Sequence, residues 1–122
     1  IQSGVRRMLA AGGAQVEEVD YREGLTRCCG FGGMIEPVDG DLRQRISKRR
    51  MNESENPIIT YRAGCRIALN TAGANAIHTL DFLLASDWKE AMAKKAPGAI
   101  GRYANRLKTK WAFKRLRPLE NE

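Results

Sequence analysis

Residues 57–73, PIITYRAGCRIALNTAG, carry the clearest indication of the fold class. The first five of these residues are rich in β-branched and aromatic side chains, and this composition predicts a strand. From Ile67 the apolar pattern continues as a helix that fades at Gly73. A strand that passes directly into a helix is typical of α/β proteins with a parallel sheet. The pattern also places Cys65 at the strand-to-helix junction, where a helix N-terminus favours a thiolate.

Further elements on both sides of this stretch alternate in the same way. We therefore expect an α/β fold: a small, mainly parallel sheet flanked by helices, with a C-terminal helical extension. The helix that follows the cysteine pair has Asp39 or Asp41 as a possible N-cap. The other predicted elements are helices over 2–11, 41–51 and 88–95, a short strand over 14–19 near a sheet edge, and a strand or short helix over 76–84.

Length and composition restrict the class of protein. The chain has 122 residues, of which 43% are hydrophobic and 29% charged, and this suits a globular domain rather than a disordered chain. Apolar runs such as 82–85 are far shorter than the roughly 18 residues that a membrane span needs. Because Ile1 falls inside what reads as the first turn of a helix, we expect the chain to be cut at its front.

The net charge of +7 is concentrated in the C-terminal part. Residues 1–85 carry 11 basic and 10 acidic side chains, whereas residues 86–122 carry 10 basic and 4 acidic ones. The division predicts a body over 1–85 and a basic helical extension over 86–122. The extension has apolar residues at helical spacing, namely Ile100, Tyr103, Leu107 and Trp111.

The basic extension has more than one interpretation. We favour a helix that packs on its own domain with a solvated basic face. The alternatives are a surface for an acidic partner subunit or for anionic lipid headgroups, which would bring the protein to the membrane periphery. Nucleic acid is the least favoured partner, because the known binding motifs are missing and the aromatic residues are few.

The three cysteines are odd in number and two of them are adjacent, so they cannot form a complete internal disulfide framework. Thiolates that meet at one edge of a sheet select zinc, copper(I) or iron-sulfur clusters. Gly30, Gly32 and Gly33 would let the backbone turn closely around a bulky inorganic group. Cysteines that are merely buried and apolar are the alternative, and either reading fits a reduced, cytoplasmic compartment.

Two motifs together resemble a known family. Cys28-Cys29-Gly30 with two further glycines, followed after 31 intervening residues (31 to 61) by Arg62-Ala63-Gly64-Cys65, is similar to the cysteine-rich "CCG" domain. That domain occurs in the B subunit of heterodisulfide reductase and in iron-sulfur subunits of enzymes that oxidise glycolate, lactate and glycerol-3-phosphate. The resemblance covers roughly residues 1–85.

The resemblance implies an iron-sulfur oxidoreductase fragment that transfers electrons through a cysteine-ligated 4Fe-4S cluster in the full-length protein. Cys28, Cys29 and Cys65 would be ligands, with Gly30, Gly32 and Gly33 shaping the loop and Arg62 as a charged neighbour. Other electron-transfer subunits, carrying iron-sulfur clusters or flavin, would be the partners, in the cytoplasm or peripheral to the inner membrane face.

The chain departs from the family pattern at two of its five cysteines. The first would lie before Ile1, and the first cysteine of the Cys-x-x-Cys motif is Arg62 here. A guanidinium stays protonated and cannot bind a metal. One alternative is a natural variant whose cluster binds through fewer cysteines. The other is a zinc-bound or metal-free assembly module that has lost the cluster and docks through its basic extension.

Other reactive side chains give weaker signals. His78 lies in an apolar stretch, where a single histidine is usually structural, although the family often has one there. Glu17 and Glu18 would lie on opposite faces of the predicted strand, so they cannot act as an acid-base pair.

Overall fold

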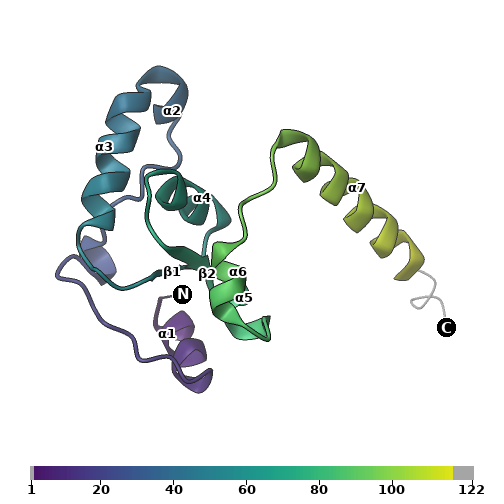
Figure 1. Ribbon diagram of the computed structural model, residues 1–122, viewed down its shortest axis with the longest axis horizontal. Helices are drawn as coiled ribbons and strands as arrows, with labels where there is room; N and C mark the ends of the chain where they lie inside the picture. The colour runs from purple at the N-terminus through teal and green to yellow at the C-terminus, as the bar shows by residue number, and fades with distance from the viewer. Residues whose placement is uncertain (1, 117–122) are drawn as a thin grey trace.

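The computed structural model describes residues 2–116 and consists mainly of helices around a very small sheet (Figure 1). The upstream elements are α1 (Gln2–Ala11), a 3₁₀ turn (Glu23–Leu25), α2 (Ile35–Val38) and α3 (Gly40–Met51). The central and downstream elements are β1 (Ile58–Thr60), α4 (Ala63–Thr71), β2 (Ala76–His78), α5 (Thr79–Leu84), α6 (Trp88–Ala93) and α7 (Ala99–Leu116).

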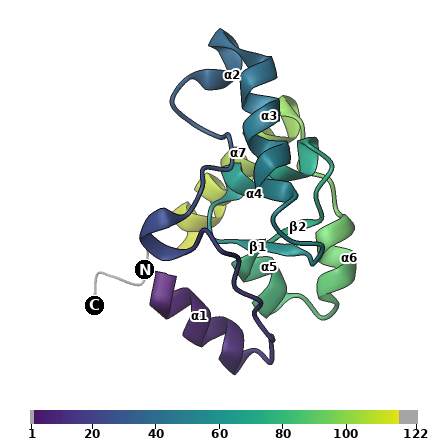
Figure 2. The same ribbon diagram turned by 90° about the vertical axis from the view of Figure 1, so that its left-hand side faces the viewer.

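The sheet is a parallel pair joined through a helix. β1 pairs with β2 in the register Ile58–Ala76, Ile59–Ile77 and Thr60–His78, and α4 is the crossover between them. The strands lie between α3 and α4 on one side and α1 and α5 on the other (Figure 2). The expected α/β fold class, with a small parallel sheet and a C-terminal helix, is therefore confirmed.

Local hydrogen bonds explain where the central elements begin and end. Asp39 caps α3 by accepting a hydrogen bond from the Leu42 backbone N–H at 2.8 Å, as one of the two predicted caps. Between α4 and β2, the Asn70 side chain accepts from the Ala76 N–H at 2.7 Å and donates to the Ala76 carbonyl at 3.0 Å. The Asn70 amide therefore pairs with both backbone groups of Ala76, as the backbone of a neighbouring strand would, and this fixes the start of β2.

The core is small and centred on α4 and β2. Leu69 and Ile77 are almost completely buried, and Leu9 from α1 closes the core from the other side of the sheet. The predicted helices over 2–11, 41–51 and 88–95 are all present, with ends shifted slightly. The predicted strand over 57–61 is β1, and the stretch 76–84 is a strand followed directly by a helix.

The strand predicted over 14–19 was wrong. This segment forms no regular element, and the sheet of the described residues has two strands only. Its charged side chains bond elsewhere: Glu18 binds Arg6 of α1 in a two-bond ion pair, and Glu17 accepts from Ser54 and Asn56. With only Val16 and Val19 as apolar anchors, the segment runs beside β1 across a hollow of about 900 Å³ instead of pairing with it.

The interpretation of the C-terminal helix as one that packs on its own domain was also wrong. α7 extends away from the rest of the molecule (Figure 1), and large apolar side chains between Ile100 and Phe113 are exposed, with 67% of the Trp111 surface and 42% of the Leu107 surface accessible. No helix within residues 2–116 is long and apolar enough to cross a membrane.

Candidate functional site

The structure brings two of the three cysteines into contact. Cys29 lies on the loop before α2, and Cys65 lies in the first turn of α4, 36 residues further along the chain; their Sγ atoms are 2.7 Å apart. Cys28 is exposed, and its Sγ accepts a weak hydrogen bond from the Gly30 N–H at 3.4 Å. The cysteine site therefore consists of a contacting pair, Cys29 and Cys65, with a third thiol beside it on the same loop.

The glycines after the cysteine pair adopt the backbone conformations for which glycine is suited. Gly30, Gly32 and Gly33 have φ values of 82°, 116° and 62°. Gly30 also packs against α3, because a Cβ there would lie 2.6 Å from Ser47 Oγ and 2.8 Å from the Arg43 carbonyl oxygen. The loop is thus coiled tightly and seated on α3.

A hydrogen bond fixes the cysteine loop on the same helix. The buried Ser47 hydroxyl donates to the Cys29 carbonyl at 2.8 Å. Because Ser47 is fully buried, this bond has no competition from bulk water and holds the backbone of Cys29 in place. The sequence reasoning did not identify Ser47, since one serine in the polar sequence of α3 carries no distinctive signal.

A second contact that sequence reasoning missed joins the two motifs. The Phe31 ring lies directly against the backbone of Gly64, where a Cβ would be only 2.2 Å from the ring. Glycine inside a helix costs stability relative to alanine, so a glycine there often marks a place where another group packs closely on the helix backbone. Gly64 in the first turn of α4 could have been recognised in the sequence for this reason. Phe31 and Gly64 together hold the cysteine loop against the N-terminus of α4.

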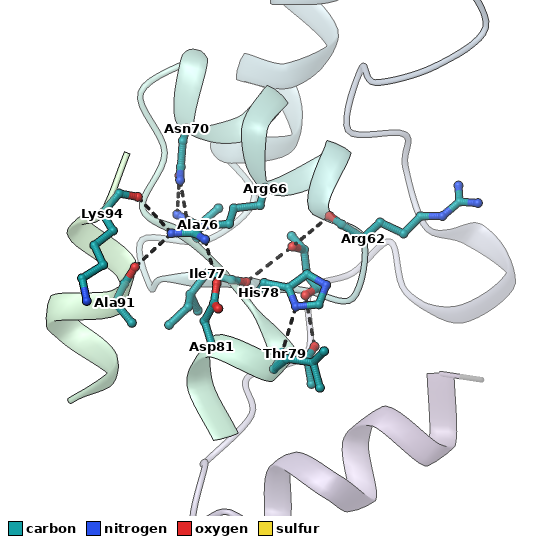
Figure 3. Close-up of polar contacts among 12 residues, drawn as sticks. Arg62, Arg66, Asn70, Ala76, Ile77, His78, Thr79, Asp81, Ala91 and Lys94 are labelled. Carbon is teal, nitrogen blue, oxygen red and sulfur yellow. Dashed lines mark hydrogen bonds and ion pairs between the residues drawn. The ribbon is translucent and has the colours of Figure 1, made fainter. Parts of the chain in front are cut away.

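The two arginines of residues 57–73, Arg62 and Arg66, have different roles. Arg62 precedes α4, and its exposed side chain points away from the polar network of α4 (Figure 3). Arg66 instead forms an ion pair with Asp81 at 2.6 Å and donates to the carbonyl oxygens of Ala91 and Lys94 at 2.9 and 3.0 Å (Figure 3). Arg66, which sequence reasoning did not single out, joins α4 to α5 and α6.

The environment of Cys65 disfavours its thiolate. Burial, the hydrogen bond with Cys29 and the nearby charges of Cys29 and Cys28 raise the pKa of Cys65 to about 12, against the opposing positive charge of Arg62. The expected effect of the helix N-terminus is therefore outweighed by desolvation. A soft metal ion would have to displace this proton in order to bind.

The remaining candidates do not join the cysteine site. His78 caps α5, where its Nδ1 accepts from the Leu80 N–H at 3.2 Å, as expected of a structural histidine. The hollow beside β1 is lined by none of the cysteines. Within residues 2–116 no group of three or more His, Cys, Asp or Glu side chains is arranged to hold a metal ion.

Comparisons with protein-family models, with curated proteins and with solved structures found no match to this chain. The resemblance to the CCG domain therefore stays a prediction that rests on the two motifs of the sequence.

Proposed function

We propose that this chain is part of an iron-sulfur oxidoreductase and contributes Cys28, Cys29 and Cys65 to a 4Fe-4S cluster. The single observation that supports the proposal best is the contact of Cys29 with Cys65, which lie far apart in the sequence and meet at the edge where β1 passes into α4. A soft-metal site needs this kind of convergence, in which thiols from separate segments meet in a loop shaped by glycine.

The donor set suits a cluster better than a hard cation. All three candidate ligands are sulfur atoms, and the loop offers backbone N–H groups, such as that of Gly30, which already bonds a cysteine sulfur. Such hydrogen bonds to thiolate sulfur raise the reduction potential of a cluster. When bound, the cluster would take up and release single electrons, which iron-sulfur or flavin subunits would supply or accept.

Arg62 occupies the position where the resembled family has a further cysteine, and this gives the proposal its test. We expect Arg62→Cys to increase the iron bound after anaerobic reconstitution with iron and sulfide, because it restores a fourth thiolate beside the existing three. Iron and sulfide content, visible absorption and EPR of the reduced sample measure the outcome. Arg62→Ser is the matched control, since it removes the charge without adding a ligand.

The proposal fails if Arg62→Cys stays colourless and binds no more iron than Arg62→Ser. It also requires that Cys65→Ser, made in the Arg62→Cys background, removes the gain. A gain that persists without Cys65 would mean that iron binds elsewhere on the chain.

A second candidate function, a docking module bound through α7, is favoured by a specific observation. α7 carries six basic and no acidic residues, and its apolar side chains are exposed. Charge and apolar surface together suit an acidic partner subunit or an anionic lipid surface. In this candidate the cysteine site is vacant or holds zinc, so Arg62→Cys would leave binding through α7 and iron content unchanged.

Flotation with vesicles distinguishes the two surfaces that α7 could bind. Binding to vesicles rich in anionic phospholipid, weakened by salt and by Trp111→Ala, supports the lipid surface. Equal recovery with purely zwitterionic vesicles, or no binding to either kind of vesicle, excludes the anionic lipid surface. An acidic partner subunit then remains as the surface that α7 binds.

A further inference from the structure

We propose that Cys29 and Cys65 form a reversible disulfide with low-molecular-weight disulfides such as glutathione disulfide, and that this bond controls whether the cysteine site can take up metal. The disulfide itself stands on the geometry of the metal-free chain. Only its consequence for metal uptake rests on the proposed function.

The two sulfur atoms are brought together by contacts that do not involve the thiols. Ser47 holds the Cys29 carbonyl, Phe31 packs on Gly64, and Gly30 is seated on α3. These contacts fix the loop and the first turn of α4 with the sulfurs 2.7 Å apart. A disulfide forms readily only where the backbone already presents the two side chains to each other, so the folded chain has little rearrangement to make.

Cys28 is poorly placed to replace Cys29 as the partner of Cys65. Its Sγ is exposed and bonded to the Gly30 N–H of its own loop. A bond between the adjacent Cys28 and Cys29 would close a small strained ring. Cys28 therefore stays as an accessible thiol in the oxidised chain.

The reaction proceeds by two thiol-disulfide exchanges. The Cys29 thiolate attacks one sulfur of glutathione disulfide, forms a mixed disulfide and releases a first glutathione thiolate, which takes up a proton. Cys65 then loses its proton and attacks Cys29 Sγ, which releases the second glutathione. Two protein thiols are oxidised to one disulfide, and glutathione disulfide is reduced to two glutathione molecules.

Oxidation removes two of the three candidate ligands at once. A disulfide sulfur carries no thiolate charge, and the thiolate is the form that binds soft metals. The site would then accept metal only after reduction, so the thiol-disulfide balance of the surroundings would determine loading.

The first experiment maps the disulfide in the metal-free chain. After incubation with glutathione disulfide and alkylation, mass spectrometry should find a linked Cys29–Cys65 pair and an alkylated Cys28. Cys28→Ser should oxidise at the wild-type rate, whereas Cys29→Ser should form its only possible linkage, Cys28 to Cys65, at least about tenfold more slowly. The same reaction in denaturing urea is the control for folding and should abolish this preference.

Two results would overturn the proposal that Cys29 and Cys65 form a disulfide. One is a stable glutathione adduct as the final product, and the other is an equal rate of oxidation for Cys28→Ser and Cys29→Ser in the folded chain. Neither result bears on whether a cluster binds.

The second experiment uses zinc as the probe of metal uptake. The reduced chain should bind zinc, the oxidised chain should not, and a thiol reductant should restore binding. Equal zinc binding by the oxidised and reduced chains overturns the control of metal uptake. If the reduced chain binds neither zinc nor iron while the disulfide forms as described, the proposed function fails and the disulfide stands.

Discussion

The body of the structure, which with α6 included comprises residues 2–93 rather than the expected 1–85, and the helix α7 differ in how they use their positive charges. In the body, several arginines form ion pairs: Arg66 with Asp81, Arg6 with Glu18, and both Arg27 and Arg50 with Glu53. α7 carries six basic side chains and no acidic one, so it cannot pair them within the helix. Part of the charge in the body therefore connects structural elements, whereas charge on α7 is available to a partner.

The largest expected effect contrasts one leucine in each region. Leu69 is only 1% exposed, so Leu69→Ala should lower the free energy of unfolding by about 2–5 kcal/mol through lost burial and a cavity. Leu107 on α7 is 42% exposed, and Leu107→Ala should change it by less than about 0.5 kcal/mol. Urea unfolding followed by circular dichroism measures both. A Leu107→Ala cost equal to that of Leu69→Ala would mean that α7 packs on the body in solution.

Next in size is the contrast between the two arginines of residues 57–73, Arg66 and Arg62. Arg66→Ala removes one ion pair and two bonds to carbonyl oxygens, and it should lower the free energy of unfolding by about 1–3 kcal/mol. Arg62→Ala should cost less than about 0.5 kcal/mol, since the Arg62 side chain is exposed. Thermal unfolding of both variants tests this. Equal costs would refute the assignment of Arg66 as the residue that joins α4 to α5 and α6.

Gly64→Ala tests the contact that seats the cysteine loop on α4. The added Cβ displaces the half-exposed Phe31 ring, while alanine favours the helix more than glycine does, so we expect a net change in the free energy of unfolding below about 1 kcal/mol, with faster alkylation of Cys29 and Cys65 as the loop lifts. Gly4→Ala in α1 is the matched control, because a Cβ at Gly4 meets no atom within 4 Å. Gly4→Ala should leave the free energy of unfolding unchanged or raise it by up to about 1 kcal/mol. Unchanged alkylation in Gly64→Ala would show that Phe31 does not hold the loop.

A separate, pH-dependent effect should appear at alkaline pH in the reduced, metal-free chain. Folding raises the pKa of Cys65 from 9.0 to about 12, so the folded state keeps a proton that the unfolded state loses. The resulting stability is complete below pH 9 and is lost as pH rises from 9 toward 12. The difference in unfolding midpoint between the wild type and Cys65→Ser should therefore change over this range. A constant difference would mean that Cys65 titrates alike in both states.

The regular elements of the fold were largely predictable because their signals are local. The apolar residues of 57–73 fixed a strand followed by a helix, and Asp39 marked the start of α3. The segment 14–19 was mispredicted because its alternating pattern shows only that it can be extended. Whether an extended segment pairs depends on partners such as Arg6 and Asn56, which are distant in sequence.

The amino-acid sequence shows which residues could bind a metal or a partner, namely three thiols with glycines around them and a basic C-terminal helix. The tertiary structure alone decided that Cys29, and not the adjacent Cys28, meets Cys65, and that Arg66 is a connector while Arg62 faces solvent. The physical reason is that residue types and local periodicity are properties of neighbouring residues. Contacts across 36 residues depend instead on how Phe31 and Ser47 pack against distant helices.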